Sequence, residues 1–133
     1  MKNSDKTLIF FIDDEPMSNI MNSTLIQRLH PDVEVKTFTN GKDALDDLKN
    51  LSLKKPELIF LDLNMPEMSG WTFMEEFKKT GLDIEVVILT SSTDLTDIEK
   101  AENEKQIKEY MIKPLNINTF KDFIKRFFKI MEI

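Results

Sequence analysis

Five side chains that could do chemistry stand directly after apolar, strand-like segments or one residue further on. They are Asp13 and Asp14 after residues 8–12, Asp62 after residues 58–61, Thr90 after residues 84–89, and Lys113 after residues 109–112. Carboxylates that lie close together repel one another, so they stay ionised only if a cation neutralises them. Few oxygen ligands with room for water favour Mg²⁺, whereas Ca²⁺ needs more protein oxygens and Zn²⁺ prefers His or Cys. An aspartate can also attack phosphorus and form an aspartyl phosphate, with a metal, an ammonium and a hydroxyl surrounding the transferred group.

Strands and helices alternate along the sequence, and this order would bring the five side chains to one place. The four apolar residues 58–61 are typical of a strand buried on both faces of a parallel sheet. The expected strands cover residues 8–12, 33–38, 58–61, 84–89 and 109–112, and the expected helices contain residues 17–25, 44–48, 71–77, 94–105 and 116–131. Five such units predict an α/β fold, a five-stranded parallel sheet in the flavodoxin-like doubly wound order 2-1-3-4-5. The carboxyl ends of its strands share one edge, where the five side chains would meet.

The last two helices carry more detailed expectations. In residues 94–105, Thr96 and Glu99 indicate a capping box, and a thin apolar stripe predicts the most mobile helix. The apolar stripe of residues 116–131 consists of Ile117, Phe120, Ile124, Phe127 and Met131, beside a basic row of Lys121, Lys125 and Lys129. We expect the two helices to form a docking surface; the alternative is a well-buried helix with a solvated charged face.

Composition narrows the class of protein. The chain has 133 residues, 41% of them hydrophobic, and we expect a single domain over residues 1–133 without an output domain. Its net charge of −6 argues against direct nucleic-acid binding, and its longest apolar runs are too short to span a membrane. The chain contains no cysteine, which excludes a disulfide scaffold and fits a cytoplasmic location.

Five short motifs follow one another in a fixed order. They are Asp-Asp-Glu-Pro at 13–16, Asp-Leu-Asn-Met-Pro at 62–66, Gly70, Thr90 and Lys-Pro at 113–114. Each is weak alone, but together, at the ends of successive β-α units, they are specific. Over practically the whole chain this order resembles the receiver domain of two-component response regulators. Two stretches differ from the family pattern: Ser91 replaces a very small residue, and residues 105–108 lack the usual glycine and alanine.

The resemblance implies a role for each residue of the site. Asp62 would be the phosphoacceptor, and Lys113 would pair first with its carboxylate and then with the phosphoryl group. Asp14 would bind Mg²⁺ directly and Asp13 mostly through water. Asp62 and the backbone carbonyl of Asn64 would complete the protein ligands of the metal. The peptide bond between Lys113 and the following proline would be cis.

The resemblance also implies a switch and its partners. Thr90 would turn toward a phosphoryl oxygen and Tyr110 would move inward behind it, with residues 94–105 shifting as part of the same two-state element. The phosphodonor would be a sensor histidine kinase or a phosphotransfer protein, and the output an unknown downstream protein. The chain would be a monomer or a phosphorylation-dependent homodimer. It would be a self-phosphorylating, slowly self-dephosphorylating switch and not a metabolic enzyme.

Two other functions stay open. A Mg²⁺-dependent phosphatase with an aspartate nucleophile uses the same groups, but its nucleophile lies on the first strand within Asp-x-Asp, whereas Asp13 and Asp14 are adjacent. A receiver-fold module used only for protein contact would incorporate no phosphate. An FMN carrier is weaker still, because no Ser/Thr/Gly phosphate loop follows the first strand.

Overall fold

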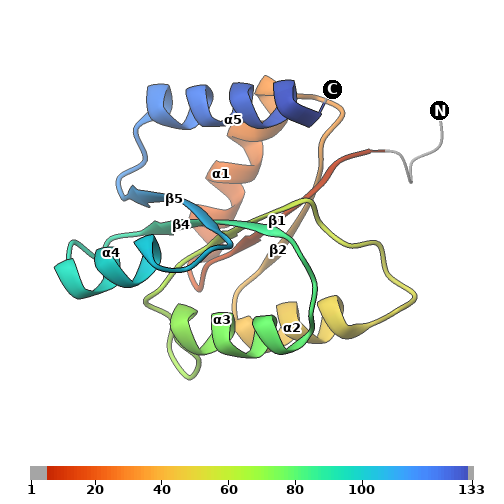
Figure 1. The fold of residues 1–133 in the computed structure, drawn as a ribbon. Helices are drawn as coiled ribbons and strands as arrows, with labels where there is room; N and C mark the ends of the chain where they lie inside the picture. The colour runs from red at the N-terminus through yellow and green to blue at the C-terminus, as the bar shows by residue number, and fades with distance from the viewer. Residues whose placement is uncertain (1–5, 132–133) are drawn as a thin grey trace.

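The computed structural model describes residues 6–131, with side chains through residue 129, and five strands alternate with five helices (Figure 1). The strands are β1 (Leu8–Ile12), β2 (Glu34–Phe38), β3 (Leu58–Leu61), β4 (Glu85–Thr90) and β5 (Ile107–Ile112). The helices are α1 (Pro16–Leu29), α2 (Gly41–Lys49), α3 (Gly70–Lys79), α4 (Leu95–Glu102) and α5 (Ile117–Met131).

All strand pairs in the sheet are parallel, in the order β2-β1-β3-β4-β5. This confirms the predicted flavodoxin-like α/β fold and its 2-1-3-4-5 order. In the register of the sheet, Ile12 at the end of β1 lies beside Leu61 at the end of β3, and Thr90 lies beside Ile112. The residues that follow these strands therefore emerge at one edge.

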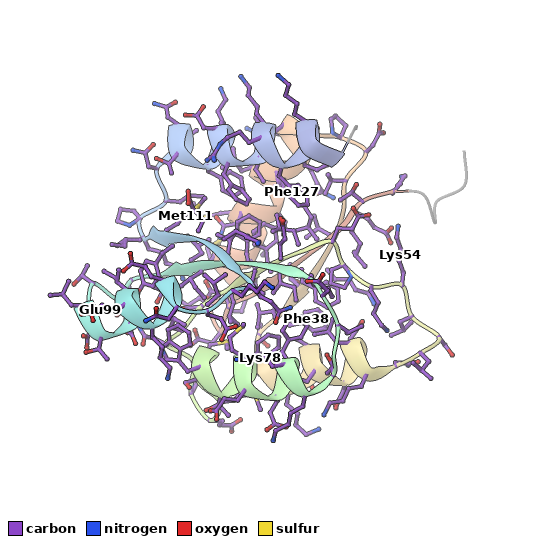
Figure 2. All side chains as sticks on the ribbon, viewed as in Figure 1. Phe38, Lys54, Lys78, Glu99, Met111 and Phe127 are labelled. Atoms are coloured by element: carbon purple, nitrogen blue, oxygen red, sulfur yellow. The ribbon has the colours of Figure 1, made fainter. Side chains whose placement is uncertain are left out.

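Two hydrophobic clusters cover the two faces of the sheet. Side chains alternate along each strand, so Phe10 joins the cluster under α2 and α3 while Phe11 joins the cluster under α1 and α5. Figure 1 shows these helix pairs on opposite sides of the sheet, with α4 beside β5 at its edge. Figure 2 shows Phe127 between α5 and the sheet, where it packs in the same cluster as Met111. Burial on both faces explains why β1 and β3 are apolar throughout.

Helix α4 begins at Leu95 and ends at Glu102, so it is shorter than the expected 94–105. Its N-cap is Asp94, whose side chain accepts a hydrogen bond from the Thr96 N–H at 2.9 Å. The predicted capping box of Thr96 and Glu99 is therefore wrong. An aspartate at the N-cap accepts a hydrogen bond from a free amide and places negative charge at the positive helix end, which explains why Asp94 and not Thr96 caps the helix.

The expected stripe of α5 is only partly correct. Phe120, Ile124 and Phe127 are buried, but Ile117 is 57% exposed. Ile117 is the first residue of the helix, and Phe123 is buried on the helix's inner face instead. The Met131 side chain lies outside the described residues.

The glycine-free loop before β5 is held by a side chain. Gln106 Nε2 donates to the Leu82 carbonyl at 3.0 Å and to the Ile84 carbonyl at 3.3 Å. With the chain fixed there, β5 begins at Ile107, two residues earlier than expected. Within residues 6–131 no helix is long and apolar enough to cross a membrane.

Candidate functional site

The ends of β1 and β3 bring three carboxylates together. Asp13 and Asp62 directly follow the paired residues at the ends of these strands, and Asp14 comes next. One carboxylate oxygen from each of Asp13, Asp14 and Asp62 lies within 4.8 Å of the other two. Asp13 is 4% exposed and Asp62 is 6% exposed, while Asp14 is half-buried. Negative charges so close together and so shielded from water repel one another, and a cation beside them offsets this repulsion.

Lys113, the residue after β5, supplies one cation. Its Nζ lies 2.5 Å from Asp13 Oδ2 and 3.3 Å from Asp62 Oδ2. Burial alone lowers the pKa of the Lys113 ammonium, but its hydrogen bond to Asp13 and the nearby charges of Asp62 and Asp13 outweigh burial and raise that pKa. Its N–H donates to the Thr90 carbonyl at 2.7 Å, and the following Lys113–Pro114 peptide bond is cis, as the resemblance implies. One ammonium balances only part of the charge of three carboxylates.

Backbone contacts orient Asp62. Its own N–H donates to the Ile12 carbonyl at 3.0 Å, and its Oδ1 accepts from the Asn64 N–H at 3.1 Å. A Cβ on Gly70 would lie 2.7 Å from the Asp62 carbonyl oxygen and 2.8 Å from Leu63 Cα, so the start of α3 approaches this closely only because residue 70 is glycine. Asn64 thus contacts Asp62 through its backbone N–H. That its backbone carbonyl is a metal ligand stays a prediction.

Asn19 is a site residue that sequence reasoning missed. It is buried on α1, and its Nδ2 donates to the Asp13 carbonyl at 3.0 Å and the Phe38 carbonyl at 3.1 Å. The Asp13 N–H also donates to the Phe38 carbonyl at 3.0 Å, and Asp13 Oδ1 accepts from the Glu15 N–H at 3.0 Å. Asn19 therefore fixes the backbone that carries Asp13. The signal available in the sequence was a polar side chain that can hydrogen-bond to the backbone, inside a helix expected to pack on the sheet.

Thr90 and Tyr110 meet at Ser92. Thr90 is fully buried, and its Oγ1 accepts from the Ser92 N–H over a long 3.4 Å contact. The Tyr110 hydroxyl donates to the Ser92 carbonyl at 3.0 Å, and its ring packs against the core under α2 and α3. Burial raises the pKa of the Tyr110 phenol despite this hydrogen bond. Tyr110 is thus turned toward the β4–α4 loop.

The three carboxylates fit a hard divalent cation. All the ligand atoms that these three side chains offer are oxygens. The described residues offer few of them, which suits Mg²⁺ because this ion keeps several of its bound waters. Within residues 6–131 this is the only group of three or more His, Cys, Asp or Glu side chains close enough to hold a metal ion. Asp13 and Asp62 each direct one oxygen at Lys113 and accept a backbone N–H on the other, so Asp14 is the carboxylate best able to bind a cation directly.

Known proteins share both the sequence pattern and the fold. Residues 9–125 match the model of the response regulator receiver domain. A probable C4-dicarboxylate response regulator from Halalkalibacterium halodurans is 25% identical over 113 residues, which cover 85% of this chain and 47% of the relative. The chain spans about half the length of several such relatives.

Solved structures agree with the sequence match. A two-component response regulator from Cytophaga hutchinsonii superposes with a TM-score of 0.78 at 30% identity, covering 91% of this chain and 96% of that one. The Thermotoga maritima response regulator TrrA, solved with Mg²⁺ and beryllofluoride, has a TM-score of 0.72 at 26% identity, covering 90% of this chain and 97% of that one. With a family match over most of its length and the same fold, the chain belongs to the response regulator receiver domain family.

Proposed function

We propose that the chain accepts a phosphoryl group on Asp62, in a Mg²⁺-dependent reaction, from the phosphohistidine of a sensor histidine kinase or phosphotransfer protein. The observation that carries this proposal is the Asp13, Asp14 and Asp62 cluster with Lys113 Nζ placed between two of its carboxylates. The structure of the Thermotoga maritima response regulator TrrA holds Mg²⁺ and beryllofluoride, which supports the proposal. Two-component signalling is the family's role, so we propose a switch and not a metabolic enzyme.

The side chains at the site have distinct parts in the transfer. An Asp62 carboxylate oxygen attacks phosphorus, forming the O–P bond as the P–N bond breaks; the imidazole leaves with the electron pair. The Lys113 ammonium, now shared between Asp13 and Asp62, is placed to follow the charge onto the phosphoryl oxygens. Thr90 offers a hydroxyl donor from the neighbouring strand. Mg²⁺, when bound, supplies further positive charge to the phosphoryl oxygens.

A phosphatase is the main competing function. Both functions start with an aspartyl phosphate, but a phosphatase hydrolyses it rapidly and repeatedly, whereas a switch retains it. Incubation with acetyl phosphate and Mg²⁺ should transfer at most one phosphoryl group to each chain, and p-nitrophenyl phosphate should give no sustained phosphate release. Rapid, sustained turnover of that ester would favour the phosphatase, and no incorporation at all would favour a module used only for protein contact.

Asp14→Asn should weaken Mg²⁺ binding by at least about tenfold, because it removes charge from a small set of oxygen ligands, and even the loss of an outer partner of a metal ligand typically costs that much. Isothermal titration with MgCl₂ measures the dissociation constant. Asp46→Asn, which removes a carboxylate from the exposed face of α2, is the matched control and should leave Mg²⁺ affinity unchanged. Equal Mg²⁺ affinity in Asp14→Asn and the wild-type chain would exclude Asp14 as a ligand.

We propose that α4, β5 and α5 together form the surface that passes the signal to a downstream protein. Helix α4 buries only Ala101 fully, and its Leu95 side chain is 71% exposed. A helix held by so little apolar area can shift at low cost when the neighbouring loop moves. The exposed lysines of α5, Lys125 and Lys129, add positive charge to this surface.

The phosphodonor is proposed to dock on α1. Met17, Ile20 and Met21 are each more than half exposed, an unusual concentration of apolar surface on one short segment. Helix α1 begins two residues after Asp14, so this apolar segment borders the carboxylate cluster. A donor that must bring a phosphohistidine to Asp62 has to cover this border.

Ile20→Arg should therefore lower the second-order rate of transfer from the phosphorylated partner by at least about tenfold, because it places a charge in an apolar contact. Labelling by acetyl phosphate should not change. Gln27→Arg adds the same charge further along α1, on an exposed position, and should leave both rates unaltered. Loss of acetyl phosphate labelling in Ile20→Arg would place the defect in the site and not in docking.

A further inference from the structure

Hydrogen bonds join α4 to Trp71 on α3 and to Ser92 in the β4–α4 loop, beside the proposed phosphorylation site. The indole Nε1 of Trp71 on α3 donates to Asp97 Oδ1 on α4 at 2.9 Å. The second oxygen, Asp97 Oδ2, accepts from the Ser92 hydroxyl at 2.7 Å. These two hydrogen bonds lower the pKa of the Asp97 carboxyl, so it is charged at neutral pH and accepts both bonds strongly.

Other contacts between the same elements strengthen the connection. The Lys100 ammonium of α4 lies 4.8 Å from the centre of the Trp71 ring, within cation–π distance. Lys78 of α3, labelled in Figure 2, pairs with Glu104 just after α4 at 3.0 Å. Because α4 buries little apolar surface, these polar contacts account for much of what fixes its position.

Ser92 joins this connection to the proposed switch residues. Its carbonyl accepts from the Tyr110 hydroxyl and its N–H donates to Thr90 Oγ1. Its own hydroxyl, meanwhile, is bound by Asp97. The N–H, carbonyl and hydroxyl of Ser92 thus contact Thr90, Tyr110 and Asp97, and the hydroxyl also accepts from the Asp94 N–H at 3.3 Å. A displacement of Ser92 relative to these partners would break these bonds.

We infer that Trp71 and Asp97 are positioning residues for phosphoryl acceptance: they hold Ser92 where its carbonyl binds the Tyr110 hydroxyl and where its long 3.4 Å contact with Thr90 still allows the Thr90 hydroxyl to turn to the phosphoryl group. This inference rests on the proposed function at Asp62. Neither residue touches the carboxylate cluster in the described contacts, so their effect is on the equilibrium between loop conformations.

The expected size of the effect follows from linkage. If the bridge stabilises the loop conformation that binds the phosphoryl group, its loss reduces the fraction of chains in that conformation and weakens binding by the same factor. A hydrogen bond to a charged, partly exposed carboxylate has a modest net free energy, so the factor should be about three- to tenfold. Mg²⁺ binding by the cluster itself should not change.

The test measures beryllofluoride affinity by calorimetry in saturating Mg²⁺, for the wild-type chain, Trp71→Phe, Asp97→Asn and the double variant. Trp71→Phe keeps the aromatic packing and removes only the N–H donor. Glu99→Gln is the matched control for Asp97→Asn, since it makes the same charge change on an exposed position of α4. The ring signals of Tyr110, the only tyrosine in the chain, report the loop directly by NMR.

The inference predicts three- to tenfold weaker beryllofluoride binding in each single variant, and a double variant no weaker than the weaker single one. It also predicts changed Tyr110 ring signals with Mg²⁺ affinity and Glu99→Gln unaffected. Wild-type affinity in Trp71→Phe, or fully additive losses in the double variant, would overturn it. If the wild-type chain itself binds no beryllofluoride, the proposed function at Asp62 fails, which is a different result.

Discussion

Asp62→Asn should abolish stable phosphorylation of the chain by small phosphodonors and its binding of beryllofluoride with Mg²⁺. The amide that replaces the carboxylate is a poor nucleophile toward phosphorus and removes one negative charge from the cluster. The substitution is nearly isosteric, so the bond from the residue 62 N–H to the Ile12 carbonyl can persist, and the side-chain oxygen of asparagine can still accept the Asn64 N–H. Phosphate incorporation by intact-protein mass and calorimetric titration with beryllofluoride measure the two losses.

The comparison needs a variant of the same chemical type away from the site. Asp46→Asn changes an exposed carboxylate on α2 that pairs only with the exposed Lys42 in the described ion pairs, and it should label like the wild-type chain. Full labelling of Asp62→Asn would show that another residue accepts the phosphoryl group.

Lys113→Ala should have the second-largest effect, and it should act on stability as well as on the switch. In the absence of divalent metal, removing this ammonium leaves Asp13 and Asp62 buried without their shared partner. Breaking a buried ion pair on one side costs about 3–5 kcal/mol; because Lys113 retains some exposure, we expect about 3 kcal/mol. Urea unfolding in EDTA measures the loss, and saturating Mg²⁺ should restore much of it, since the metal replaces the missing positive charge.

Lys42→Ala serves as the control, since its exposed pair with Asp46 should contribute less than about 1 kcal/mol. Lys113→Ala should also separate phosphate uptake from the conformational response, so the Tyr110 ring signals should shift little when beryllofluoride binds. Equal unfolding free energies of the two lysine variants in EDTA would show that the ion pairs of Lys113 with Asp13 and Asp62 do not stabilise the fold.

The sequence predicted the fold because its signals are local. Apolar runs such as residues 58–61 and the amphipathic spacing of α2, α3 and α5 are properties of neighbouring residues, and handedness rules then leave few topologies. The approach of Asp13 to Asp62 also followed from topology, because each residue directly follows the end of one of two adjacent parallel strands. Where the ends of strands position a site, the fold and the order of the motifs are enough to predict which residues meet there.

What sequence reasoning missed depends on side-chain contacts between distant elements. The Trp71–Asp97 bond joins residues 26 apart on two helices, and the expected helix over residues 71–77 carries no local signal that pairs Trp71 with Asp97. Asn19 was missed for the same reason, since its partner Phe38 is 19 residues away. The cap of α4 was wrong because two competing polar residues, Asp94 and Thr96, lie within one turn of each other.

The most direct test of the account is to locate the phosphoryl group chemically. The wild-type chain is treated with acetyl phosphate and Mg²⁺, digested, and mapped by mass spectrometry, with a parallel sample in EDTA. The account predicts one added phosphoryl group, on the peptide that contains Asp62 and at that residue, and little or none in EDTA. A phosphoryl group on any other residue, or equal incorporation with and without Mg²⁺, would contradict it.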